Sequence, residues 1–330
     1  MRRSLILTLL LIATSILYVA CSSSPHSSDE IYYLVTANSK IPYWQAAHDG
    51  WRQAAQKMKV KTDFVGPDTY DPQAEQKAFQ DAVAKKPAGI LISPADAKLL
   101  QSDIDAAIGR GIPVITMDSD SPDSKRLTFI GTNNYQAGVL GGKTAVKALN
   151  GKGNVVFFSI PAQANLEERL HGYKDVFAEN PGIKVVDVID IHGDPRVAFD
   201  KTTEIIGDKK KSVDAFICLE AQAGKEVADV LDRNKVSGKT IIAMDTDDAT
   251  LDWIKKGMIR ATIAQKPYTM AFHGLMLLDH YHHHPLQPLM GDRASDSFSK
   301  VPAFVDTGAT MIDKGNVTTF LNQRQSSGGN

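Results

Sequence analysis

Short apolar runs alternate along this chain with longer stretches in which apolar residues recur every three or four positions. The short runs are typical of strands that are buried on both faces of a parallel sheet. The longer stretches have the spacing of amphipathic helices. This alternation predicts an α/β fold with mostly parallel sheets flanked by helices. The predicted strands are residues 31–36, 60–65, 89–93, 112–117, 127–130, 155–160, 185–189, 215–219, 241–244 and 260–264.

Proline stands near the start of three of the helical stretches, at Pro42, Pro72 and Pro267. Proline suits the first turn of a helix, where its missing N–H donor is not needed. The pattern predicts helices at residues 42–58, 72–83, 99–108, 135–149, 166–177, 197–206, 224–234 and 268–281.

The strand that ends at Asp118 has a counterpart 127 residues later. Residues 241–245 (IIAMD) repeat residues 114–118 (VITMD), with Asp245 in the place of Asp118. Other landmarks recur in the same order at similar offsets, which favours a domain duplication over chance similarity of α/β units. We therefore expect two Rossmann-like lobes.

The N-terminus has the pattern of an export signal. Arg2 and Arg3 precede an apolar run, and residues 18–21 (YVAC) resemble a bacterial lipoprotein cleavage box, although Tyr18 replaces the usual aliphatic residue. We expect a signal peptide at residues 1–20, lipidation of Cys21, and a flexible polar tether at residues 21–29. The only membrane contact expected is through this lipid anchor.

The charge balance argues against a nucleic-acid partner. The chain has 37 basic and 38 acidic residues and no basic tract. Cys218 lies inside an apolar run and is expected to be an inert core thiol, so a lipidated chain has no disulfide. We expect residues 326–330 to form a disordered tail.

Asp118 and Asp245 are the first candidate ligand-binding residues. Ligands in open α/β sheets sit beyond the carboxyl ends of the strands, where both aspartates stand. A carboxylate there can accept hydrogen bonds from vicinal hydroxyls. Helix capping is the alternative use of an aspartate after a strand, and paired carboxylates also occur in glycosidases. The sequence has no nucleophile elbow, so we expect a binding protein and not an enzyme.

Four further side chains are candidates at these strand ends and helix starts. Tyr43 and Trp44 can stack on an apolar sugar face, with core packing as the alternative. Arg169 is either a solvated helix residue or a donor to ligand oxygens. Gln265 ends a strand, where its amide can both donate and accept.

Other polar clusters point to no cofactor. His280, His282, His283 and His284 end a helix, but no carboxylate or cysteine completes a metal-binding spacing, so we expect a solvated loop and no metal. The glycines of residues 138–142 are not followed by the Lys-Ser/Thr pair of a phosphate loop.

The chain resembles the sugar-binding proteins of bacterial ABC importers, of the ribose and galactose type, which share a type I fold with the ligand domain of LacI-type repressors. The matching motifs are residues 41–44 (IPYW), 113–118 (PVITMD), 130–134 (IGTNN), 168–169 (ER), 244–245 (MD) and 261–265 (ATIAQ).

The resemblance implies roles for the candidate residues. In that family, aromatic residues matching Tyr43 and Trp44 sandwich the sugar, and residues matching Asp118, Arg169, Asp245 and Gln265 hydrogen-bond it. Ribose binders usually have arginine where this chain has Ser119, and an Asn-Asp pair where it has Leu219 and Glu220. Ser119 and Glu220 are therefore expected in the pocket of a protein whose ligand is not ribose itself.

The resemblance also implies an organisation and a role for the whole chain. One lobe is expected at residues 30–132 and 266–303, the other at 133–265 and 304–325, joined by three hinge crossings. We expect a monomer in the periplasm, or on the outer face of the cell membrane, that delivers a neutral monosaccharide or sugar alcohol to an ABC permease. A sensory protein that presents a sugar to a chemoreceptor or sensor kinase is the alternative. A transcriptional regulator would need a DNA-binding segment where this chain has an export signal.

Overall fold

The computed structural model describes residues 26–27, 29–208, 212–285 and 299–327 of the chain. The expected signal peptide, Cys21 and most of the expected tether lie outside the described residues. No helix of the described part is long and apolar enough to span a membrane.

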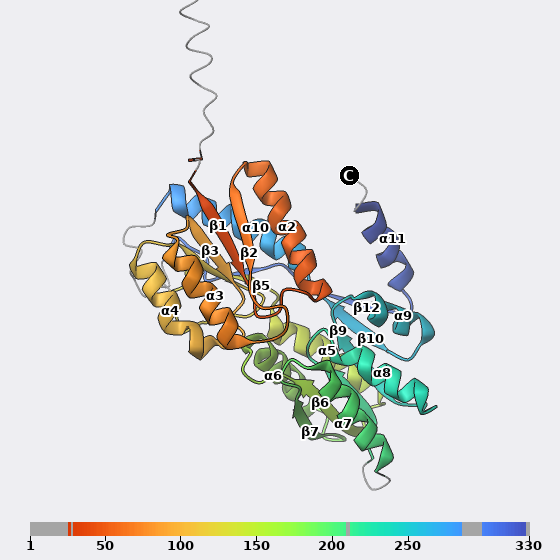
Figure 1. Cartoon of the computed structure of the whole chain (residues 1–330). Helices are drawn as coiled ribbons and strands as arrows, with labels where there is room; N and C mark the ends of the chain where they lie inside the picture. Colours follow the sequence, from red (N-terminus) through yellow and green to blue (C-terminus); the bar gives the residue numbers. More distant parts are fainter. Residues whose placement is uncertain (1–25, 28, 209–211, 286–298, 328–330) are drawn as a thin grey trace, which may run out of the picture.

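Two six-stranded sheets form the centres of two lobes, which Figure 1 shows one above the other. The first sheet is entirely parallel, with the strand order β11-β5-β4-β3-β1-β2. Its strands are β1 (Ile31–Val35), β2 (Lys61–Val65), β3 (Gly89–Ile92), β4 (Val114–Met117), β5 (Phe129–Gly131) and β11 (Phe304–Asp306).

The second sheet has the order β12-β10-β9-β8-β6-β7, and only β12 is antiparallel to its neighbour. Its strands are β6 (Gly153–Ser159), β7 (Ile183–Asp190), β8 (Ala215–Cys218), β9 (Thr240–Met244), β10 (Ala261–Ala264) and β12 (Thr310–Asp313). Corresponding strands occupy corresponding places in the two sheets, as a duplicated unit requires. The α/β fold of two lobes with parallel-dominated sheets is thereby confirmed.

Helices complete each lobe. Those of the first lobe are α2 (Pro42–Met58), α3 (Pro72–Ala84), α4 (Ala97–Gly109) and α10 (Pro267–His283). Those of the second are α5 (Asn134–Ala148), α6 (Ala164–Ala178), α7 (Pro195–Gly207), α8 (Ala223–Arg233), α9 (Asp248–Lys256) and α11 (Val317–Ser327).

The apolar runs became central strands because helices on both faces bury them. Every residue of β3, β4, β8 and β10 is buried, and each lobe has its own large hydrophobic core. Aspartate side chains cap several of the helices: Asp71, Asp96, Asp194 and Asp247 accept backbone N–H bonds in the first turns of α3, α4, α7 and α9.

The chain passes between the lobes three times: between β5 and α5, between β10 and α10, and between β11 and β12. The third passage corrects the expected boundary. Phe304 was expected to open the last segment of the second lobe, but β11 pairs with β5, and the Phe304 ring stacks on Phe129 at 5.1 Å. The crossing therefore follows Asp306.

The C-terminal segment also differs from the expectation. The last helix, α11, runs to Ser327, so the expected disordered tail is wrong for residues 326 and 327. Phe320 and Leu321 of this helix pack against the core of the second lobe. Residues 328–330 lie outside the described part.

Candidate ligand-binding site between the lobes

A cleft of about 620 Å³, its open mouth included, lies between the carboxyl ends of the two sheets. Both lobes line it. Seven of the eight predicted binding residues are among the lining side chains: Tyr43, Trp44, Asp118, Arg169, Glu220, Asp245 and Gln265. Ser119 is not. Its side chain is buried beside the cleft, because the backbone turns sharply there and the Ser119 N–H bonds back to the Met117 carbonyl.

Asp118 and Asp245 occupy equivalent positions directly after β4 and β9. Both have left-handed backbone conformations, with φ of 62° and 67°. This conformation is uncommon for residues other than glycine, although aspartate and asparagine adopt it more readily than most, and it occurs at functional sites as well as in turns. Neither aspartate caps a helix, since Asp247 caps α9 and Asn133 caps α5. The capping alternative is therefore wrong for both.

Hydrogen bonds from both lobes hold the Asp118 carboxylate. The Tyr43 hydroxyl donates to Oδ1 at 2.5 Å, and Asn165 Nδ2, from the second lobe, donates to Oδ2 at 3.1 Å. Ser93 Oγ lies 3.4 Å from Oδ2. Burial raises the pKa of Asp118, against the opposing effects of the Tyr43 hydrogen bond and the Arg169 charge.

Arg169 of α6 carries the positive charge of the cleft and is only 1% exposed. Its Nη2 donates to Asn134 Oδ1 at 2.6 Å, and its Nη1 donates to the Leu219 carbonyl. Its Nε has no partner among the described residues. Burial lowers the pKa of Arg169, and the charges of Asp245 and Asp118 oppose this. The solvated-helix alternative for Arg169 is wrong.

The Asp245 carboxylate lies beside Gln265, whose Nε2 donates to Oδ1 at 3.0 Å. Burial raises the pKa of Asp245 to about 7, although the Arg169 charge and the Gln265 hydrogen bond act in the opposite direction. The other amide atom, Gln265 Oε1, is buried without a partner among the described residues.

The two aromatic residues form part of one wall. Tyr43 and Trp44 meet edge to face, with ring centroids 5.0 Å apart and planes at 86°. Rings in this contact leave no slot between them, and the sandwich that the resemblance implies stays a prediction. Trp44 is 8% exposed and belongs to the core of the first lobe, so core packing and cleft lining both apply to it.

Glu220 has a structural partner at the start of α8. Its two carboxylate oxygens accept the backbone N–H groups of Gln222 at 2.7 Å and Ala223 at 2.6 Å. Burial raises its pKa, and these two hydrogen bonds oppose the increase. Glu220 therefore lines the cleft with its oxygens already bonded to the helix start.

Sequence reasoning missed two residues that hold Asp118. Ser93 follows β3, so the strand-end rule that selected Asp118 also applies to it. Asn165 stands four residues before Arg169 and so lies on the same face of α6. Asn134 accepts a hydrogen bond from Arg169 and so orients it. It lies in the matching motif of residues 130–134, but the sequence did not predict it as a site residue.

Comparison with known proteins fits this geometry. The pattern of the family described as periplasmic binding protein domain matches residues 31–282. The chain belongs to the periplasmic binding protein family. This membership suggests a location outside the cytoplasm.

Relatives of this binding protein include a D-apiose import binding protein from Paraburkholderia graminis, 25% identical over 82% of this chain and 86% of the relative. The D-allose-binding periplasmic protein of Escherichia coli is 24% identical over 75% of this chain and 83% of that relative. Among solved structures, an arabinose-binding protein from Geobacillus stearothermophilus is 34% identical, with a TM-score of 0.72 over 88% of this chain and 99% of that chain.

Proposed function

We propose that this binding protein captures a neutral monosaccharide or sugar alcohol between its lobes and delivers it to an ABC permease. The observation that carries the proposal is the pair of left-handed, buried aspartates, one from each lobe, that flank the buried Arg169 in one cleft. Each lobe supplies one equivalent carboxylate, so a ligand with hydroxyl groups on both sides can bond to both lobes at once.

The unpartnered polar atoms support a ligand rich in hydroxyl groups. Arg169 Nε can donate a hydrogen bond and Gln265 Oε1 can accept one. Buried polar atoms are nearly always paired, so a group that satisfies both is expected in the cleft. A sugar hydroxyl can donate to an aspartate or to Gln265 and accept from Arg169.

The charge of the cleft argues against an anionic ligand. Three carboxyl groups, those of Asp118, Asp245 and Glu220, line the cleft, whereas Arg169 supplies its single guanidinium. A phosphate or carboxylate would lose its hydration on entering and would meet more carboxylates than cationic donors. A neutral polyol has no such penalty.

Calorimetry with matched ligands tests the proposal. A panel of pentoses, hexoses and sugar alcohols identifies the ligand, which is then compared with its phosphate and its uronic acid at neutral pH. We expect the neutral form to bind at least tenfold more tightly than either charged form. Equal or tighter binding of a charged form would show that the cleft residues act differently.

Import is favoured over signalling as the purpose of binding. The relatives from Paraburkholderia graminis and Escherichia coli are named for sugar import and periplasmic sugar binding, and neither is named as an enzyme. Neighbouring genes for a permease and an ATPase would agree with import, and a neighbouring sensor kinase alone would favour the sensory alternative.

We further propose that the protein acts as a monomer held at the membrane by a lipid on Cys21. The cysteine lies outside the described residues, and the support is the signal-like N-terminus. Radiolabelled fatty acid should appear on the wild-type protein and be absent from Cys21→Ser. Equal labelling of both proteins, or labelling of neither, would contradict the anchor.

A further inference from the structure

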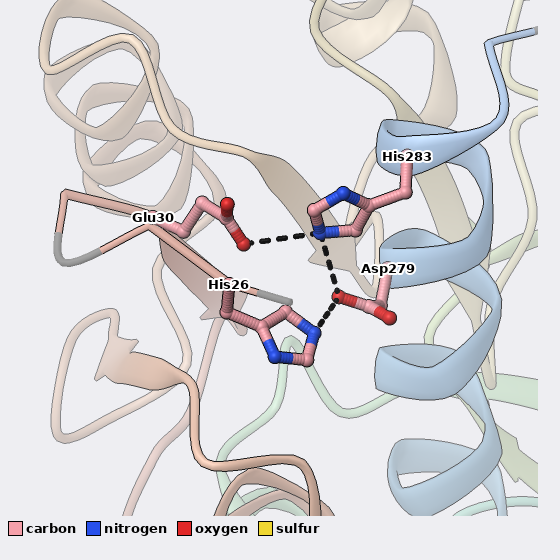
Figure 2. Close-up of side chains that lie close together, drawn as sticks. All are labelled: His26, Glu30, Asp279 and His283. Atoms are coloured by element: carbon pink, nitrogen blue, oxygen red, sulfur yellow. Dashed lines mark hydrogen bonds and ion pairs between the residues drawn. The ribbon is translucent and has the colours of Figure 1, made fainter. Parts of the chain in front are cut away.

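Two histidines and two carboxylates meet where the N-terminal segment reaches the end of α10. His26 and Glu30 come from the segment before β1, and Asp279 and His283 come from the last turns of α10 (Figure 2). One potential ligand atom from each of the four side chains lies within 4.8 Å of all the others. No other such group occurs in the part of the chain that the structure describes.

The spacing between these atoms fits a small metal ion. His26 Nε2 lies 2.9 Å from Asp279 Oδ1, and His283 Nε2 lies 3.1 Å from Glu30 Oε2 and 3.5 Å from Asp279 Oδ1. A tetrahedral zinc site has bonds of about 2.0–2.2 Å, which places neighbouring ligand atoms roughly 3.3–3.6 Å apart. Small adjustments of the side chains would therefore admit the ion.

The arrangement is held in place by surrounding groups. The Tyr32 hydroxyl donates to Asp279 Oδ1 at 2.9 Å, and the Ser27 N–H donates to Glu30 Oε1 at 2.7 Å. The second bond leaves Glu30 Oε2 facing His283. Hydrogen bonds to ligating carboxylates are a regular feature of metal sites, because they fix the direction of the oxygens.

Both pairs of residues have a spacing of four. On α10 this places Asp279 and His283 on one face of the helix, one turn apart. The helix end by itself contributes only two of the four side chains, Asp279 and His283, because His26 and Glu30 are about 250 residues away in the sequence. The fold supplies the other two by placing the start of β1 beside the end of α10.

We propose that these four residues bind one Zn²⁺ ion, which fastens the N-terminal segment to the first lobe. Two imidazoles and two carboxylates match the nitrogen and oxygen ligands and the coordination number that zinc prefers. The four side chains are only 10–30% exposed, so the ion would be partly shielded from water.

The position of the site separates it from the cleft. Glu30 directly precedes β1, whereas Ala37 and Asn38, just beyond the other end of that strand, line the cleft. Zinc would therefore fix the end of the chain that leads towards Cys21 without touching the sugar site. The proposal does not depend on the identity of the cleft's ligand.

Titration calorimetry with Zn²⁺ on the purified full chain tests the proposal. A Cys21→Ser background removes a nearby thiol, and a purification tag without histidine avoids a competing site. We expect one Zn²⁺ per chain, with His26→Gln and Asp279→Asn each weakening the affinity at least tenfold. Zinc should also slow hydrogen exchange of the backbone amides between residues 26 and 31.

A matched control uses the other histidines of the same helix end. His280 and His284 are also four apart, with ring centroids 4.9 Å from each other, but they are not part of the group of four. The double variant His280→Gln/His284→Gln should bind Zn²⁺ as the parent does. Loss of binding in this double variant, unchanged binding in His26→Gln, or no stoichiometric binding at all would each overturn the proposal. In the last case the side chains form only imidazole–carboxylate pairs.

Discussion

Asp118 and Asp245 combine an uncommon backbone conformation with a buried carboxyl group, and the described residues show no capping role that would account for either. Burial raises the pKa of both side chains. Groups of this kind are retained where function requires them. At the residue scale, we therefore expect these two aspartates to favour ligand binding and to lower the stability of the ligand-free protein.

Replacing either aspartate by asparagine tests this role while preserving shape. Asparagine tolerates the left-handed conformation, so Asp118→Asn and Asp245→Asn should fold. A hydrogen bond to a charged group contributes about 1.5–3 kcal/mol, so each variant should bind the sugar roughly 10- to 150-fold more weakly by calorimetry. Asp96→Asn is the control, because asparagine caps a helix as well as aspartate does. Affinities within threefold of wild type in both cleft variants would contradict the assignment.

The pKa of Asp245, about 7 in the folded protein against 3.8 as its ordinary value, predicts a pH dependence. Between these values the folded protein holds a proton that the unfolded chain has lost. The stability of the ligand-free protein should therefore fall as pH rises from about 4 to about 7. A ligand that donates hydrogen bonds prefers the ionised carboxylate, so sugar affinity should rise over the same range.

Calorimetry between pH 5.5 and 8 measures this linkage. At one pH unit below the pKa of Asp245, protonation of this carboxyl group should make sugar binding about tenfold weaker than it is well above that pKa. The sugar affinity of Asp245→Asn should depend less steeply on pH than that of wild type, because the variant lacks the one proton that Asp245 releases on binding. An identical slope in the two proteins would assign the effect to other groups.

At the scale of elements, close packing of α5 against α6 positions Arg169. A Cβ atom added to Gly138 would lie 2.0 Å from the Arg169 carbonyl oxygen, and one added to Gly172 would lie 2.2 Å from the Tyr135 carbonyl oxygen. The two helices therefore approach through glycine. This approach brings Asn134 of α5 within reach of the Arg169 guanidinium.

Gly172→Ala should separate these helices. Overpacking costs about 1–3 kcal/mol, so the free energy of unfolding in urea should fall by that amount. Sugar affinity should fall as well, because Arg169 moves away from Asn134. Gly207→Ala is the control, since a Cβ atom there meets no atom of the described residues within 4 Å. Equal stability of the two variants would show that the helices can adjust without cost.

At the scale of the whole molecule, three crossings join two lobes that each have their own core. Separate cores allow the lobes to move as rigid bodies about short connections. A ligand that contacts both lobes favours the state in which they are closest, in proportion to its extra contacts there.

Small-angle X-ray scattering should therefore give a smaller radius of gyration with saturating sugar than without it. The double variant Asp118→Asn/Asp245→Asn, measured at the same sugar concentration, should show no change. A wild-type radius that is unaffected at saturation would mean that the lobes do not close on the ligand.

The sequence by itself determined the features that depend on local order. Apolar runs and helical spacing predicted the strand–helix series, and the repeat of residues 114–118 at 241–245 predicted two equivalent lobes with an aspartate in each. These inferences succeeded because side-chain periodicity follows directly from the geometry of strands and helices.

Only the tertiary structure decided which distant side chains meet. It buried Arg169 between Asn134 and Leu219, brought Asn165 to Asp118 across the cleft, and joined β11 to the first sheet. It also placed Glu30 beside His283. Such contacts depend on how whole elements pack, and spacing along a chain carries no measure of the distance between residues from separate elements.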